Sequence, residues 1–244
     1  MVSRRGHRAL VVNGLFDQSS KFAHELAYEL SRGPGDIKSD ALYAVNSMAE
    51  EGTLGAATLA CVDIVTLRQK TFLEVCALGD CEVAIFRQRQ ENLERPDGEW
   101  VRVFGSGGAT GWMSGAETTG ESESESEAGD EAGDEATPQF HPMAIAGGSF
   151  LSVTSDGVFA TPRFARNMLP VRVLVQAHDA VVIGSYGLFR SLGEGQIEAI
   201  IAEAVGDGYD DNAGQRLSRM LVREAKKAAV QSFDISAIAG LVRL

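Results

Sequence analysis

The sequence predicts an α+β fold in which β-sheets are covered by α-helices. Two observations carry this prediction. Apolar strand patterns and helical patterns occur in blocks along the chain, and the helical patterns come in pairs. The order is one strand, two helices, a meander of strands, further strands, two helices and a last strand.

The chain begins with a strand and two helices. Residues 9–14 (ALVVNG) have the pattern of a short buried strand that ends at a turn. Residues 19–35 have serines at the start, Gly-Pro at the end and one apolar helical stripe, formed by Phe22, Leu26 and Leu30. Residues 36–52 repeat this plan and end at a glycine, so two helices follow one strand.

Short apolar or alternating segments with turns between them follow from residue 55 to residue 104. They predict a meander of antiparallel strands. Beyond Phe140, three further strand patterns (FLSVTS, VRVLVQ and AVVIGS) precede two amphipathic helical patterns, at residues 195–208 and 212–230. The stretch ISAIAGLVRL predicts a closing strand.

A low-complexity segment interrupts the chain at about residues 106–138, which are rich in Gly, Ser, Glu and Ala. Such a composition cannot bury enough apolar surface to offset the entropy of ordering, so we expect a disordered insertion in a single domain spanning residues 1–244. Its Ser-Glu repeat, with Ser122, Ser124 and Ser126, is similar to acidophilic kinase sites. Regulation by phosphorylation is therefore an alternative to a plain solvated loop.

The formal net charge of −12 comes mostly from this insertion. Nine acidic residues and no basic residue lie between Glu117 and Thr137, and subtracting these nine charges from −12 leaves −3. The remaining charge balance is ordinary, and no basic cluster suggests a nucleic-acid-binding face. No run of about 18 apolar residues is present, so we expect no membrane-spanning helix.

The three cysteines, Cys61, Cys76 and Cys81, fall within predicted strands. An odd count in a chain of this length argues against a disulfide scaffold. The absence of a Cys-x-x-Cys pair and the scattered histidines argue against a zinc site. We therefore expect buried, free thiols.

Two stretches share a pattern in which an apolar run is followed by Ser-x-Gly, an apolar residue and Phe. The first, SFLSVTSDGVFATP, has Asp156 at the variable position, and the second, HDAVVIGSYGLFRS, has Tyr186. An aspartate at the end of a buried strand is suited to holding a metal ion, whereas a tyrosine is not. The pattern alone leaves open which copy belongs to a functional site.

Five motifs occur along the chain in this order: ALVVNGLFDQSSKFAHELAYEL, GAATLACVD, LEVCALGDCEVAIFR, PVRVLVQAHDAVVIGSYGLFRSL and DISAIAGLVRL. Their order and spacing resemble those of the metal-dependent Ser/Thr protein phosphatases of type 2C, the PPM family, and its short branch in mitochondria and plastids. The resemblance covers nearly the whole chain apart from the acidic insertion. It implies two packed antiparallel β-sheets flanked by pairs of α-helices, with a two-metal site at one edge between the sheets.

The resemblance also implies which residues stand at the metal-binding positions. In the family, two Mg²⁺ or Mn²⁺ ions held mainly by carboxylates activate the water that hydrolyses a phosphoester. Asn13 replaces the bridging Asp, Tyr186 replaces the Asp of the second Asp-Gly turn, and Phe233 replaces the Asp before Ile-Thr. The residual candidates for metal binding are Gly14, Asp80 and Asp234.

In this alignment GSYGLF occupies the catalytic turn, and Asp156 is a turn residue at a strand end. The Glu-Asp pair that precedes the first strand in the family has no counterpart. Its phosphate-binding arginine is also missing, although three arginines lie nearby: Arg4, Arg5 and Arg8. The alternative is a shifted register, in which Asp17, Asp156 and Asp234 are the ligands.

The loss of these carboxylates predicts a pseudophosphatase with no catalytic residues and no bound cofactor. We expect an interaction or scaffold domain, or an assembly subunit, that binds a protein partner. The alternative is an active Mg²⁺- or Mn²⁺-dependent Ser/Thr phosphatase with a rearranged acid set. We expect an intracellular protein, cytoplasmic or organellar, and the resemblance points to mitochondria.

Overall fold

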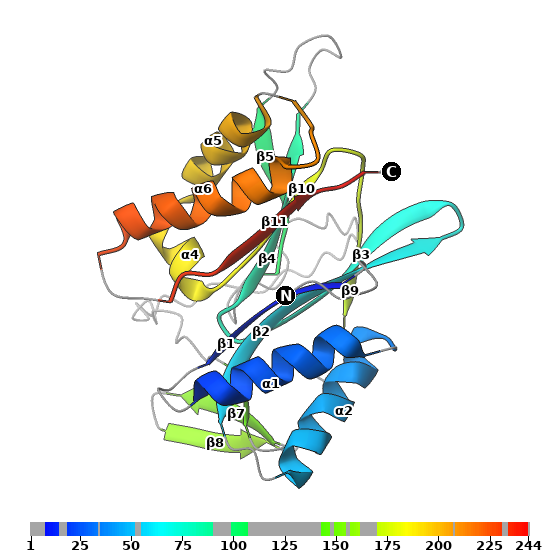
Figure 1. Ribbon diagram of the computed structural model, residues 1–244, viewed down its shortest axis with the longest axis vertical. Helices are drawn as coiled ribbons and strands as arrows, with labels where there is room; N and C mark the ends of the chain where they lie inside the picture. Colours follow the sequence, from blue (N-terminus) through cyan, green and yellow to red (C-terminus); the bar gives the residue numbers. More distant parts are fainter. Residues whose placement is uncertain are drawn as a thin grey trace, which may run out of the picture.

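The computed structural model describes residues 8–14, 19–33, 35–51, 55–89, 99–106, 143–146, 149–154, 157–161, 170–206, 208–230 and 234–243. Two antiparallel sheets lie at its centre, and helices cover the outer side of each sheet (Figure 1). The α+β fold expected from the sequence is therefore confirmed. The three serines of the acidic segment lie outside the described residues.

The first sheet has seven strands in the order β8-β7-β6-β2-β3-β9, and β1 pairs with β2. Its strands are β1 (Arg8–Gly14), β2 (Ala56–Leu67), β3 (Lys70–Leu78), β6 (Met143–Ala146), β7 (Ser149–Thr154), β8 (Gly157–Thr161) and β9 (Val171–Leu174). In the register, Asn13 at the end of β1 lies opposite Thr58. Beyond the helices, β2 and β3 extend as a hairpin whose two turn residues, Arg68 and Gln69, both have positive φ.

The second sheet has four strands in the order β11-β10-β4-β5. These are β4 (Glu82–Gln88), β5 (Trp100–Gly105), β10 (Ala180–Gly184) and β11 (Ala237–Leu241). An apolar layer from the strands of both sheets forms the centre of the sandwich. It includes Val11, Ala60, Val75, Ile85, Val181 and Ile183, all of them at most 8% exposed.

Two helices pack on the first sheet and three on the second (Figure 1). They are α1 (Ser19–Arg32), α2 (Ile37–Glu50), α4 (Tyr186–Ser191), α5 (Glu194–Val205) and α6 (Ala213–Ala228). The predicted stripe of α1 is confirmed, because Phe22, Leu26 and Leu30 are at most 1% exposed in a core that they share with the first sheet. No helix in the described part of the chain is long and apolar enough to cross a membrane.

The two similar stretches of sequence have different structures. The first forms the paired strands β7 and β8, which are joined at residues 155–156. The second forms β10, which leads directly into the short helix α4. Asp156 lies outside the described residues, whereas Tyr186 is the first residue of α4.

A buried arginine connects the first sheet to its two helices. Arg8 is 4% exposed and donates five hydrogen bonds. Its Nε and Nη2 bind the two carboxylate oxygens of Asp63 at 2.8 and 2.7 Å, and its Nη1 lies 2.6 Å from Oδ2 of Asp40. The remaining two bonds go to the carbonyl oxygens of Leu30 and Gly35. Arg8 therefore holds together β1, β2, the end of α1 and the start of α2.

The charged groups around Arg8 also affect its protonation. Burial acts to lower the pKa of Arg8, but the hydrogen bonds to Asp63 and Asp40 raise it above its ordinary value. The guanidinium is therefore charged at every pH at which the protein is folded. Such an arginine has no free donor face for a phosphate, so Arg8 does not substitute for the arginine that the family uses.

The three cysteines are free and buried, as the sequence predicts. Burial raises the pKa of Cys76 and Cys81 to about 12 and that of Cys61 well above its ordinary value. Because the thiolate is the reactive form, we expect no fast reaction of the native protein with Ellman's reagent at pH 8. In guanidinium chloride all three thiols should react. Rapid stoichiometric labelling of the native chain would contradict this expectation.

Candidate functional site

Five strand ends meet at one end of the sandwich and bring the predicted site residues together. Asn13, at the end of β1, lies opposite Thr58 near the start of β2. On the second sheet, Gly184 at the end of β10 lies opposite both Glu82 of β4 and Ala237 of β11. The structure thus gathers the first, second, third and fifth motifs, and the GSYG segment of the fourth, at one edge.

Hydrogen bonds fix Asn13 against the turn between β3 and β4. Oγ1 of Thr58 lies 3.2 Å from the sulfur of Cys81, and the backbone of Asn13 also forms a hydrogen bond with that sulfur. Thr58 and Cys81 are both fully buried. Asp80 directly precedes Cys81, so it lies one residue along the chain from the sulfur that is hydrogen-bonded to the backbone of Asn13.

Asp80 carries an unusual carboxylate. Its Oδ1 is buried and has no hydrogen-bond partner within the described part of the chain. A buried acceptor without a partner costs roughly 1–3 kcal/mol, and more when it is charged. The negative charge of Asp80 adds to burial in raising the pKa of Cys81. Asp80 is therefore a predicted metal candidate with one carboxylate oxygen that no described group satisfies.

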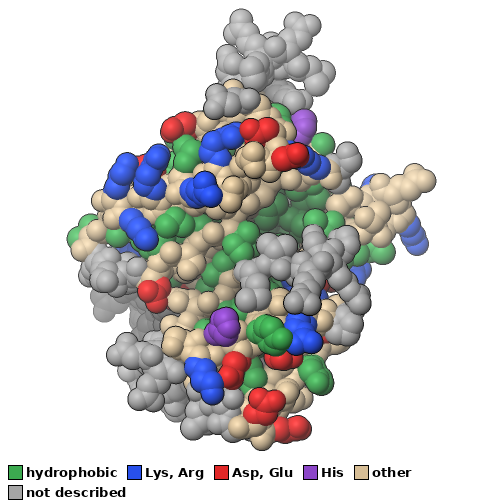
Figure 2. All heavy atoms as spheres, in the orientation of Figure 1, with side chains coloured by type: hydrophobic (Ala, Val, Ile, Leu, Met, Phe, Trp, Pro, Cys, Tyr) green, Lys and Arg blue, Asp and Glu red, His purple; other side chains and the backbone are tan. Residues whose placement is uncertain are grey.

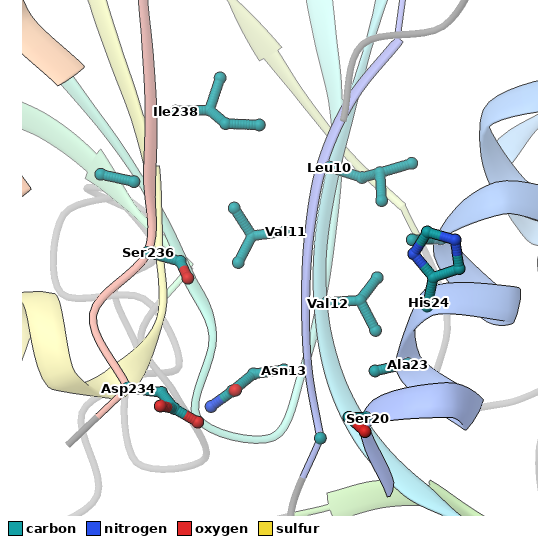
Figure 3. A pocket seen from close by; sticks show the side chains of 13 residues that line it. Leu10, Val11, Val12, Asn13, Ser20, Ala23, His24, Asp234, Ser236 and Ile238 are labelled. Atoms are coloured by element: carbon teal, nitrogen blue, oxygen red, sulfur yellow. The ribbon is translucent and has the colours of Figure 1, made fainter. Parts of the chain in front are cut away.

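Ser185 positions Asp234 on the other side of the site. The buried Ser185 hydroxyl donates to the backbone oxygen of Asp234 at 2.7 Å and accepts from the backbone N–H of Ser236 at 3.0 Å. These bonds fix the segment that enters β11. The carboxylate of Asp234 remains exposed and points toward the amide of Asn13 across a groove (Figure 3).

Tyr186 follows Ser185 directly and is half-buried at the start of α4. It therefore lies next to the segment that holds Asp234, but it does not line the groove that Asn13 and Asp234 share. Gly14 does line that groove. Phe233 and Asp17 lie outside the described residues, so their predicted roles stay predictions.

One acidic residue of this region was missed in the sequence. Glu82 follows the Gly-Asp-Cys turn, and Arg102 of β5 forms an ion pair with it. Burial raises the pKa of Glu82 even though Arg102 acts to lower it. Its place two residues after Asp80 was a visible signal, but its partner is 20 residues away on another strand. Because Arg102 neutralises it, Glu82 adds little negative charge for a cation.

The described residues that meet here supply few of the anionic ligands that a two-metal centre needs. Two dications that share a bridging water need several anionic oxygen ligands. This edge supplies the carboxylates of Asp80 and Asp234 and the neutral amide of Asn13. It also supplies Glu82, which is already paired with Arg102. Across the ranges that the structure describes, no three His, Cys, Asp or Glu side chains are grouped closely enough to hold a metal ion.

The groove between Asn13 and Asp234 has a volume of about 640 Å³. It lies between β1, α1 and β11, with Val11 and Ile238 on facing sides of it (Figure 3). On the molecular surface, hydrophobic side chains gather in the band between α6 and α1 (Figure 2). The groove is thus lined by polar as well as apolar groups, with Asn13 and Asp234 at one end and Ser20 and His24 on the α1 side.

Solved structures identify the class of fold. No protein-family model and no curated protein matches this sequence. The photosystem II phosphatase PBCP matches 100% of the chain over 96% of its own length, with a TM-score of 0.51 and 16% identity. The PPM Ser-Thr phosphatase MsPP from Mycobacterium smegmatis, solved with cacodylate, matches 96% of the chain over 87% of its own length, with a TM-score of 0.52 and 16% identity.

A third structure, PppA, described as a key regulatory component of T6SS in Pseudomonas aeruginosa, matches 96% of the chain over 85% of its own length. Its TM-score is 0.53, at 11% identity. The chain therefore has the fold of the PPM-type Ser/Thr phosphatases, which confirms the predicted resemblance at the level of architecture.

Proposed function

We propose that this chain is a PPM-type phosphatase domain that does not hydrolyse phosphoesters and that functions by binding another protein. The observation that carries the proposal is the chemistry of the strand-end site. Asn13 offers a neutral amide where a bridging carboxylate is required, and Tyr186 follows the strand end where a second carboxylate is required. Neutral oxygen ligands hold paired dications far less well than carboxylates do.

The direct test is hydrolysis of p-nitrophenyl phosphate and of a phosphothreonine peptide in the presence of Mn²⁺. We expect no turnover above that of a protein-free control, because no activated water is held at the site. Asp80→Asn serves as the matched variant, since it removes the carboxylate with the unpaired oxygen at nearly constant volume. Turnover by the natural chain that disappears in Asp80→Asn overturns the proposal.

The second candidate is an active phosphatase with a rearranged acid set. The unpaired Oδ1 of Asp80 and the orientation of Asp234 toward Asn13 favour it, because both leave carboxylate oxygens available to a cation. Calorimetry with Mn²⁺ separates the two candidates. Two ions bound per chain support the active enzyme, and no binding supports the inactive domain.

A further inference from the structure

Helix α6 has one buried stripe and one basic stripe. The buried stripe packs with the second sheet and its helices and consists of Ala213, Leu217, Met220, Leu221 and Ala225. The basic stripe consists of Arg216, Arg219, Arg223, Lys226 and Lys227. Because a helix turns by about 100° per residue, these five bases fall within one sector of about 100°, away from the buried stripe. Figure 2 shows Lys and Arg side chains gathered over α6.

One acid serves two residues of the basic stripe. Glu224 is the single acidic residue of α6, and it forms ion pairs with Arg223 and Lys227 at 2.8 and 2.9 Å. Arg216 pairs with Asp210, which precedes the helix. The side chains of Arg223 and Lys227 are 58% and 64% exposed, so their pairs contribute little to stability and leave both cations accessible.

Two residues of the basic stripe have no acid beside them. Arg219 and Lys226 are exposed, and neither has an ion-pair partner among the residues that the structure describes. The negative end of the helix dipole stabilises Lys226 in the last turn, but it does not reach Arg219 near the middle of α6. Like charges on one helix face repel one another, so a bound anion would relieve this repulsion.

The basic stripe contrasts with its surroundings. The whole chain has a net charge of −12, and the neighbouring helix α5 contains three glutamates and no Lys or Arg. No ion pair joins α5 to α6 within the described ranges. A nucleic acid or a membrane surface that extends beyond α6 would therefore be repelled by the chain, whereas a short acidic segment would meet mainly the basic stripe.

The spacing of the bases defines the shape of the occupant. The basic stripe is roughly 16 Å long at about 1.5 Å per residue. Its first four members stand at i, i+3, i+7 and i+10 of α6. A second helix with glutamates at the same four spacings can place one carboxylate opposite each of these bases when it lies along α6. Guanidinium groups also suit carboxylates because they bind them through two parallel hydrogen bonds.

We propose that the basic stripe of α6 binds an acidic helical segment of a partner protein. The segment carries glutamates at i, i+3, i+7 and i+10, and the carboxylates opposite Arg219 and Lys226 make the most important contacts. This inference rests on the proposed function, because it names the surface and the class of partner through which the inactive domain acts.

The test titrates the full chain into a fluorescein-labelled, alanine-based peptide that has glutamates at i, i+3, i+7 and i+10. Fluorescence polarisation in about 0.15 M salt measures binding under conditions that screen long-range attraction. The control peptide has the same composition, but its four glutamates are consecutive. Consecutive residues are distributed around a helix, so this peptide cannot present four carboxylates on one face.

Three double variants locate the binding surface. Arg219→Glu/Lys226→Glu reverses the two unpaired charges, and Arg219→Gln/Lys226→Gln only removes them. The matched control, Arg68→Glu/Lys70→Glu, makes the same change in net charge at the exposed turn between β2 and β3. All four natural side chains are exposed, and thermal unfolding of each variant verifies that the fold is retained.

The expected result is saturable binding of the spaced peptide by the natural chain and by Arg68→Glu/Lys70→Glu. Affinity should fall at least about tenfold in Arg219→Glu/Lys226→Glu and by a smaller factor in Arg219→Gln/Lys226→Gln. The control peptide should bind more weakly to the natural chain than the spaced peptide does. Binding should also weaken as salt increases from about 0.1 to about 1 M, because the Debye length falls from about 10 to about 3 Å.

Three results would overturn the inference. The first is an absence of saturable binding. The second is an equal loss of affinity in Arg219→Glu/Lys226→Glu and in Arg68→Glu/Lys70→Glu, which would show an effect of net charge alone. The third is tighter binding of a single-stranded oligonucleotide than of the peptide, which would make a nucleic acid the occupant.

A full-length variant tests whether the chain's own acidic segment is the occupant. In this variant the nine acids between Glu117 and Thr137 are replaced by their amides. A gain in peptide affinity of more than about tenfold, abolished by Arg219→Glu/Lys226→Glu, would assign the basic stripe to that segment and overturn the inference. None of these outcomes affects the hydrolysis assay, whereas phosphatase turnover would refute the proposed function whether or not the peptide binds.

Discussion

Replacement of Arg8 by methionine is expected to lower the free energy of unfolding by about 3–5 kcal/mol. The substitution keeps a long side chain in the space of Arg8 but removes all five hydrogen bonds that the guanidinium donates. Asp40 and Asp63, at 7% and 15% side-chain exposure, then lose their cation while they stay largely buried. Urea unfolding followed by circular dichroism measures the effect.

The matched control is Arg172→Met. Arg172 also pairs with an acid of the first sheet, Glu74, but its side chain is 55% exposed. Exposed ion pairs contribute roughly 0–1 kcal/mol, so this variant should be close to the natural chain in stability. Equal losses in Arg8→Met and Arg172→Met would show that the buried network is not a special source of stability.

Removing the charges of Arg8, Asp40 and Asp63 together tests why Arg8→Met loses stability. The triple variant Arg8→Met/Asp40→Leu/Asp63→Val leaves no unpaired buried carboxylate, so it should recover much of the stability that Arg8→Met loses. If the triple variant is no more stable than Arg8→Met, the stability comes instead from the hydrogen bonds of Arg8 to the backbone carbonyls of Leu30 and Gly35.

Restoring carboxylates at the strand-end site is expected to create a manganese site. In the variant Asn13→Asp/Tyr186→Asp two anionic ligands join Asp80, whose Oδ1 has no partner in the described part of the structure. Without metal, the added charges repel one another and lower the melting temperature. With Mn²⁺ at about one hundred times its dissociation constant, the melting temperature should rise by roughly 5–10 °C, because the ion binds only the folded chain.

Differential scanning calorimetry with and without Mn²⁺ measures this rise. The natural chain should show little response, and Asp80→Asn in the double-variant background should remove most of it. An equal Mn²⁺ response in the natural chain and the double variant would mean that the natural site already binds the ion. That outcome would favour the active phosphatase over the inactive domain.

The predictability of the fold differed between its elements. The stripe of α1 and the β2–β3 pairing are carried by local periodicity, and both were predicted correctly. The helix α4 was not predicted. Its six residues include a glycine and are too few to show a repeating helical pattern of apolar residues. Its Leu188 is fully buried against the second sheet and its helices, so tertiary packing stabilises this helix more than local propensity does.

The site was predictable where a motif placed a residue at a strand end, as for Asn13 and Asp80. It was not predictable where the partner is distant in sequence. Arg8 and Asp63 are 55 residues apart and meet only because β1 pairs with β2 in one register. The pairing of Glu82 with Arg102 depends in the same way on the pairing of β4 with β5.

The β2–β3 hairpin offers a practical point of attachment. Its turn, Arg68–Gln69, is exposed and lies at the far end of β2 from Thr58. Leu67 lies nine residue steps along β2 from Thr58, a distance of roughly 30 Å at about 3.4 Å per residue. A fluorophore or an affinity tag inserted at this turn would therefore report on the molecule, or immobilise it on a sensor, without obstructing the groove.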